Sequence, residues 1–226
     1  MNFMESLNIE FLLDIFWIGS TIAALFSALP ISIVNRWIRH GKLIRGADEA
    51  GFVPKKWFSH FYIYGIVATW LLTPVLSSGR YWLLTHLWRR LLEQVVLFPC
   101  SETSRMHLSA YLYGFLFYTA VALTVPMQPS FPFLLVAGNI IQFFSHHALF
   151  MNRWMRRAED VKKSPPESFW FKYMHCPHYF AEMLIYAGLV SFSQLSSQLC
   201  LLFVCVSLSV NWRNHSQFYK TNSNSH

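Results

Sequence analysis

Charged side chains are scarce in this chain. Lysine, arginine, aspartate and glutamate make up 13% of its 226 residues, whereas a soluble domain usually carries about 25%. Hydrophobic residues make up 54%, and the mean hydropathy is +0.32. The shortage of charge argues against an ordinary soluble domain and indicates a polytopic membrane protein.

Sequence signatures of several other protein classes are also missing. No G-x-G-x-x-G motif is present, so a strand-based dinucleotide site is not expected. The four cysteines lie in or beside apolar runs without the spacing of a metal or disulfide site, and we interpret them as packing residues. Acidic rather than basic residues precede the first apolar run, unlike a cleavable signal peptide. No soluble domain or internal repeat is evident, which predicts a single domain over residues 1–226.

Instead of these signatures, the chain has long apolar runs. A helix that crosses a bilayer core of about 30 Å needs roughly 20 apolar residues. On this basis we predict an all-α integral membrane protein with about seven transmembrane helices. The expected spans cover residues 9–34, 57–76, 81–98, 107–125, 131–151, 178–192 and 195–212.

The cations indicate how these helices are oriented. With a luminal N-terminus, 15 of the 18 lysines and arginines fall on one side of the membrane, which the positive-inside rule assigns to the cytosol. The net charge of +7 is therefore interpreted as membrane topology, and no nucleic-acid partner is expected.

Polar side chains gather near the cytosolic ends of the predicted spans. Three pairs are spaced i, i+4, which places both members on one helix face: Gln142 with His146, His178 with Glu182, and His215 with Tyr219. Glu182 lies inside a predicted span, where an ionisable group is costly and a functional role is the default hypothesis. The alternatives are a glutamate buried against an arginine or backbone amides, and interfacial residues at headgroup depth.

Two other kinds of site were weighed. His146-His147 and His175-x-x-His178 resemble pieces of a di-iron oxygenase, but these clusters are too few for that chemistry, and no metal is expected. The second is an anion site in a basic loop, whose cations could hold a pyrophosphate or 2′-phosphate or could contact anionic lipid. These cations are Arg153, Arg156, Arg157, Lys162 and Lys163.

Several motifs, in order along the chain, resemble one enzyme family. Trp170-Phe171-x-Tyr173 followed by Pro177-His178-Tyr179-x-x-Glu182 is similar to the steroid 5α-reductase family, and most similar to its polyprenol reductase branch. The further elements are Val53 to Tyr62, His86-x-x-Arg89-Arg90-Leu91-x-Glu93, Ser104 to His107 with Gly114-x-x-Phe117-Tyr118, Gln142-x-x-x-His146 with Arg153, and Asn214-His215-x-x-Phe218-Tyr219. The family motifs are concentrated in residues 140–220.

The resemblance implies a seven-span helical enzyme of the endoplasmic reticulum that uses NADPH. Position by position, it implies that seven residues line the cofactor pocket: Gln142, His146, Arg153, His178, Glu182, His215 and Tyr219. The expected partners are a polyprenoid substrate and membrane lipids; the sequence leaves the oligomeric state open.

The implied reaction is reduction of the α-isoprene double bond of polyprenal or polyprenol on the route to dolichol, which supports protein N-glycosylation. A conjugated aldehyde is the better hydride acceptor, because the developing charge reaches an oxygen that a fixed donor can stabilise. His60 and His86 are the candidate donors. The alternatives are a steroid 5α-reductase, an isoprenylcysteine-type membrane methyltransferase and a catalytically silent protein.

The chain departs from the family pattern in two places. Pro166-Glu167-Ser168-Phe169 stands where the family has Pro-x-Gly-Asp before Trp-Phe. The family also continues beyond its Phe-Tyr motif with a Tyr-Pro-Lys-rich tail, whereas this sequence stops at His226. We expect a shortened tail of this kind to hold His215 and Tyr219 poorly and to weaken activity.

Overall fold

The computed structural model describes residues 3–29, 51–97, 104–155, 166 and 168–223. Its long helices are α1 (Phe3–Ser27), α3 (Phe58–Leu72), α4 (Ser78–Leu92), α5 (Leu108–Thr124), α6 (Pro132–Met155), α8 (Pro177–Leu189) and α9 (Leu195–Ser223). Each of them overlaps one of the seven predicted spans, although the bounds differ; residues 30–34 of the first predicted span and residue 98 of the third lie outside the described residues. Shorter elements are the 3-10 turn η2 (Lys55–Trp57), the π-helical turn η3 (Glu93–Leu97) and the helix α7 (Phe169–Tyr173).

Three of the helices are long and apolar enough to cross a membrane on their own. These segments are Asn8–Ser27, Pro132–Asn152 and Leu195–Gln217. The others are shorter: α8 has 13 residues and α3 has 15, which at 1.5 Å per residue gives about 20 Å and 22 Å. The structure therefore supports a helical membrane protein with three candidate spans, and the number seven stays a prediction.

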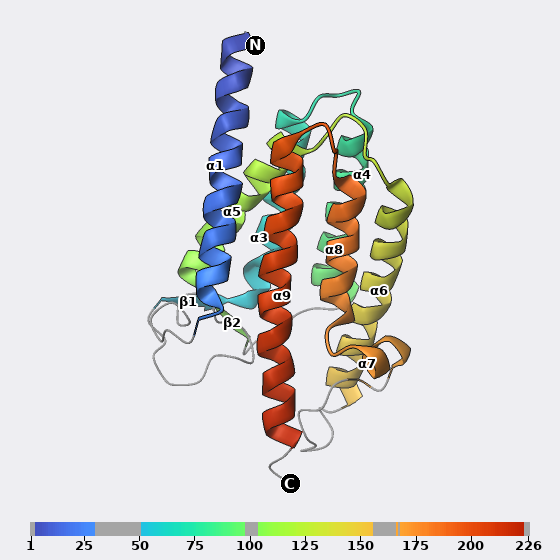
Figure 1. The fold of residues 1–226 in the computed structure, drawn as a ribbon. Helices are drawn as coiled ribbons and strands as arrows, with labels where there is room; N and C mark the ends of the chain where they lie inside the picture. Colours follow the sequence, from blue (N-terminus) through green and yellow to red (C-terminus); the bar gives the residue numbers. More distant parts are fainter. Residues whose placement is uncertain (1–2, 30–50, 98–103, 156–165, 167, 224–226) are drawn as a thin grey trace.

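The helices lie side by side in one bundle (Figure 1). Packing is closest between α6 and α8, between α1 and α9, and between α3 and its neighbours α4 and α5. α1 begins at one end of the bundle, and α9 ends at the other. The bundle thus brings α6 and α8, which carry two of the three predicted polar pairs, into direct contact.

A small antiparallel sheet joins two segments at one end of the bundle, a feature that the all-α prediction did not contain. Its strands are β1 (Phe52–Pro54) and β2 (Arg105–His107), with Val53 opposite Met106. Gly51 begins the pairing with φ of 86°, a conformation that favours glycine, and its carbonyl accepts a hydrogen bond from the Leu108 amide. The sheet fixes the starts of α3 and α5 relative to each other.

The interior of the bundle combines an apolar core with buried polar side chains. Trp17, Leu87, Leu135 and Ile185 are fully buried, and the indole of Trp17 donates a hydrogen bond to Thr124 Oγ1 at 3.1 Å. Many outward-facing side chains are large and apolar, and Phe11, Trp70, Leu71, Val96 and Phe133 are each more than half exposed. An outer surface of this kind suits lipid rather than water.

Candidate functional site

Close contact between α6 and α8 depends on two glycines. A Cβ at Gly138 would lie 2.7 Å from the Ala181 carbonyl oxygen, and one at Gly188 would lie 2.6 Å from Leu135 Cγ. Small residues let the backbones of membrane helices approach closely. The polar side chains of α6 and α8 are therefore brought within hydrogen-bonding distance in the bundle interior.

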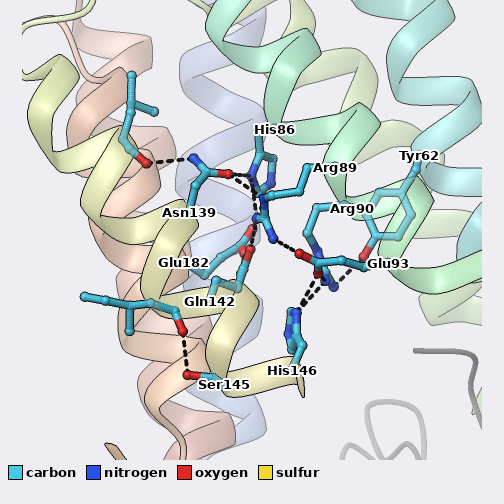
Figure 2. Close-up of polar contacts among 12 residues, drawn as sticks. Tyr62, His86, Arg89, Arg90, Glu93, Asn139, Gln142, Ser145, His146 and Glu182 are labelled. Atoms are coloured by element: carbon cyan, nitrogen blue, oxygen red, sulfur yellow. Dashed lines mark hydrogen bonds and ion pairs between the residues drawn. The ribbon is translucent and has the colours of Figure 1, made fainter. Parts of the chain in front are cut away.

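One stripe of polar residues on α6 carries much of the site. Asn139, Gln142 and His146 are spaced i, i+3, i+7, so they share one helix face. Figure 2 shows them converging with residues of α3, α4 and α8. We call nine of the residues labelled in Figure 2 the polar network: Tyr62, His86, Arg89, Arg90, Glu93, Asn139, Gln142, His146 and Glu182.

A buried carboxylate lies on the α4 side of the network. The Glu93 side chain is 2% exposed, and it accepts hydrogen bonds from Arg89 Nη1 and, at 2.5 Å, from Arg90 Nη1. His146 Nδ1 lies 2.8 Å from Glu93 Oε2. Arg90 Nη1 lies 2.7 Å from the same ring nitrogen, so His146 Nδ1 stands between a carboxylate that accepts and a guanidinium that donates.

Asn139 fixes the orientation of His86. Asn139 Nδ2 donates to the Leu135 carbonyl at 2.7 Å, so its Oδ1 faces the network as an acceptor. Arg89 Nε donates to that oxygen at 2.8 Å, and His86 Nδ1 lies 3.1 Å from it. Arg89 Nη2 lies 3.3 Å from the same ring nitrogen, so Asn139 and Arg89 together orient the His86 ring. The other ring nitrogen, Nε2, lies 3.7 Å from Glu182 Oε1.

Glu182 connects α8 to the same network. Its Oε2 accepts a hydrogen bond from Gln142 Nε2, while Gln142 Oε1 accepts one from Arg89 Nη2. The Glu182 side chain is 22% exposed, compared with 2% for His86. Glu182 is thus the more accessible carboxylate of the network, and Glu93 is the more enclosed one.

Three aromatic side chains extend the site beyond the network along α8 and α9. The rings of His178 and His146 lie 5.8 Å apart, and Tyr179 lies between His178 at 4.3 Å and His215 at 5.9 Å. His178 Nδ1 is buried without a hydrogen-bond partner among the described residues. Buried polar atoms without a partner are rare in native structures, so this ring nitrogen calls for an explanation.

The structure brings most of the sequence-predicted residues together. Gln142, His146, Glu182 and His86 belong to the network, and His178 and His215 adjoin it. His60 lies elsewhere: its Nδ1 is 2.9 Å from the Tyr111 hydroxyl, and its ring stacks on Trp57. Arg153 and Tyr219 stand in α6 and α9, and their side chains lie outside the described part of the structure.

Sequence reasoning left Tyr62, Glu93 and Asn139 out of the site. The signal for Glu93 was present, because three charged residues interrupt a predicted span at positions 89, 90 and 93, and an ion pair buried in an apolar bundle requires partners. Asn139 stands one turn before Gln142 and extends its stripe. Tyr62 carries no comparable signal, since tyrosines are frequent in this chain.

Among the described residues, no group of three or more histidines, cysteines, aspartates or glutamates is arranged to hold a metal ion. The polar network is instead held together by hydrogen bonds and ion pairs between its own side chains. Its chemistry is that of proton donors and acceptors enclosed by apolar helices.

Comparison with known proteins identifies the family. The family described as 3-oxo-5-alpha-steroid 4-dehydrogenase matches residues 103–226, more than half of the chain. The chain belongs to this family. The matched region contains α5 to α9, and so it includes the Asn139, Gln142 and His146 stripe together with Glu182.

Polyprenal reductases of other organisms are similar to this chain over most of its length. The polyprenal reductase of Saccharomyces cerevisiae is 28% identical over 231 residues, which cover 91% of this chain and 85% of the relative. Polyprenal reductase 1 of Arabidopsis thaliana is 23% identical over 276 residues, covering 87% and 86%. The human polyprenal reductase is 25% identical over 260 residues, covering 84% and 81%.

These matches confirm the resemblance inferred from the motifs. With its apolar helices, the chain is a membrane protein of a reductase family. Unlike the α6 and α8 residues, Tyr62, Arg89, Arg90 and Glu93 precede the region that the family matches. Of the comparisons above, the similarity to the polyprenal reductases, which extends over most of the chain, is the one that includes these four residues.

Proposed function

We propose that this protein reduces the α-isoprene double bond of polyprenal with NADPH, in the membrane of the endoplasmic reticulum, as a step toward dolichol for protein N-glycosylation. The observation that carries the proposal is the pairing of Glu182 with Gln142 inside an apolar helix bundle, in a chain similar to polyprenal reductases over most of its length.

The donor set of α6 and α8 fits the nicotinamide end of such a cofactor. A carboxamide carries both hydrogen-bond donors and an acceptor, and it needs partners of both kinds. Gln142 supplies an amide, Glu182 an accessible carboxylate and His178 a buried ring nitrogen that has no partner among the described side chains. When bound, NADPH supplies the hydride that adds to the β-carbon of the enal.

The remaining cofactor residues are assigned by the family motifs. His146, His215 and Tyr219 would adjoin the nicotinamide residues along α6 and α9. Arg153 would hold a phosphate, because a guanidinium forms charge-assisted hydrogen bonds with phosphate oxygens. Together with Gln142, His178 and Glu182, these residues make up the proposed cofactor pocket.

An aldehyde suits this site better than the free alcohol. Hydride addition to an isolated alkene leaves charge on a carbon with no means of delocalising it. In a conjugated enal that charge reaches the carbonyl oxygen, where a fixed donor stabilises it. Apolar helix faces around the polar network suit the prenyl chain, which is expected to remain in the lipid-facing part of the protein.

A substrate comparison tests the proposal. Membranes containing the protein are incubated with NADPH and, in parallel, with polyprenal, polyprenol or a 3-oxo-Δ4 steroid, and the lipids are analysed by mass spectrometry. We expect the polyprenal product to gain two hydrogens while the free alcohol remains unchanged. Reduction of the steroid in preference to polyprenal would assign the protein to the steroid branch, and no reduction of polyprenal would overturn the proposal.

A further inference from the structure

The hydroxyl of Tyr62 on α3 is a buried group whose donor is unused. Tyr62 is 5% exposed, and its oxygen accepts a hydrogen bond from Arg90 Nη2 at 2.8 Å. A phenol can accept and also donate. Because an arginine N–H occupies the accepting side, the phenolic proton is directed elsewhere, and the structure gives it no acceptor among the described residues.

Arg90 holds this hydroxyl in a fixed position. Its guanidinium donates to Glu93 Oε2 at 2.5 Å, lies 2.7 Å from His146 Nδ1 and stands 5.2 Å from the centre of the Tyr62 ring. Contacts with three elements leave Arg90 little freedom. A cation held in this way also stabilises negative charge on the phenolic oxygen while its proton is shared with another group.

The two histidines considered as donors are less suited to the task. His60 is engaged with the Tyr111 hydroxyl, outside the network. His86 uses Nδ1 for Asn139 and faces the Glu182 carboxylate with Nε2. Tyr62, by contrast, lies inside the network with a phenolic proton that has no acceptor among the described residues.

Tyr62 and the proposed cofactor residues occupy opposite sides of the polar network. Gln142 and Glu182 belong to α6 and α8, whereas Tyr62 belongs to α3, and Arg89 and Arg90 lie between the two groups (Figure 2). A substrate bound on the α3 side would meet a cofactor bound on the α6 and α8 side at these two arginines.

We infer that the Tyr62 hydroxyl is a catalytic proton donor to the carbonyl oxygen of the enal, with Arg90 as its positioning residue. This inference rests on the proposed function. As the hydride forms the new C–H bond at the β-carbon, the alkene electrons move toward the carbonyl, and its oxygen takes the Tyr62 proton to give an enol. The α-carbon then takes a proton from water, and the O–H proton returns to the Tyr62 phenolate.

The test compares Tyr62→Phe with Tyr64→Phe. Tyr64 lies two residues along α3 and bonds Thr119 Oγ1 at 2.7 Å, away from the network, so its variant is a matched control for loss of a hydroxyl. Removing one donor to a developing oxyanion lowers turnover by about 10²–10³-fold. We expect that loss in kcat for Tyr62→Phe, with unchanged NADPH affinity measured by fluorescence titration and near wild-type kcat for Tyr64→Phe.

The outcomes separate this inference from the proposed function. If the wild-type protein does not reduce polyprenal, the proposed function fails. If the wild type is active and Tyr62→Phe keeps its kcat, the donor role is wrong while the function stands. A Tyr62→Phe variant that loses NADPH affinity in proportion to its activity would show a structural role through Arg90 and would overturn the donor assignment.

Discussion

Arg89 and Arg90 are consecutive on α4, so their side chains leave the helix in directions about 100° apart. Arg89 reaches Asn139 and Gln142 on α6, and Arg90 reaches Tyr62 on α3. Both return to the same carboxylate, Glu93. Two adjacent cations thus join three helices through one buried anion.

Removal of that anion is predicted to destabilise the protein. Glu93→Gln leaves both guanidiniums without their buried counter-charge, which typically costs about 3–5 kcal/mol. We expect a clearly lower unfolding temperature in detergent. Glu10→Gln on the exposed face of α1 is the control and should leave the temperature unchanged; equal temperatures for the two variants would contradict the role given to Glu93.

A second prediction for a single residue concerns Glu182. Glu182→Gln keeps the shape of the side chain but removes the charge that faces His86 and accepts from Gln142. A lost charge-assisted hydrogen bond is worth roughly 1.5–3 kcal/mol, so we expect activity at low NADPH to fall about 10-fold or more while the protein stays folded in the membrane. Wild-type turnover at low NADPH would make Glu182 a structural residue.

The sequence allowed part of this arrangement to be predicted. The i, i+4 spacing placed Gln142 with His146 and His178 with Glu182 on single helix faces, and the structure turns those faces toward each other. It could not reveal which side chains from other helices complete the site. Tyr62 enters through its contact with Arg90, and a contact of this kind depends on tertiary packing.

At the scale of elements, helix positions were easier to predict than their short connections. Apolar runs gave all seven long helices, because burial and lipid exposure dominate where those helices form. The β1–β2 pairing was missed: three-residue strands separated by about 50 residues carry no periodic signal. η3 was also missed, since the prediction continued one regular span over residues 81–98, where the structure has a π-helical turn at Glu93–Leu97.

The close contact between α6 and α8 leads to a prediction about how two helices pack. Gly138→Ala places a methyl group against the Ala181 carbonyl and Ile185, and overpacking of this kind costs about 1–3 kcal/mol. We expect α6 and α8 to separate, with lower thermal stability and weaker NADPH binding. Gly19→Ala has open space around its Cβ and should change neither property; identical behaviour of the two variants would contradict the close packing.

For the whole molecule, the orientation in the membrane is the main prediction. In a background without native cysteines, Ser130→Cys, in the exposed segment between α5 and α6, should be labelled by an impermeant reagent from the lumen. Ser164→Cys, in the basic segment before α7, should be labelled from the cytosol. The reverse pattern would contradict the orientation that the positive-inside rule gives.

The central claim is that hydride reaches the β-carbon of a conjugated enal, and isotope transfer tests it most directly. The protein is incubated with polyprenal and NADPH carrying deuterium at the transferred position, and the label in the product is located by NMR and mass spectrometry. We predict one deuterium at the β-carbon of a saturated aldehyde. Deuterium on the former carbonyl carbon, with the double bond intact, would show a simple aldehyde reductase and contradict the account.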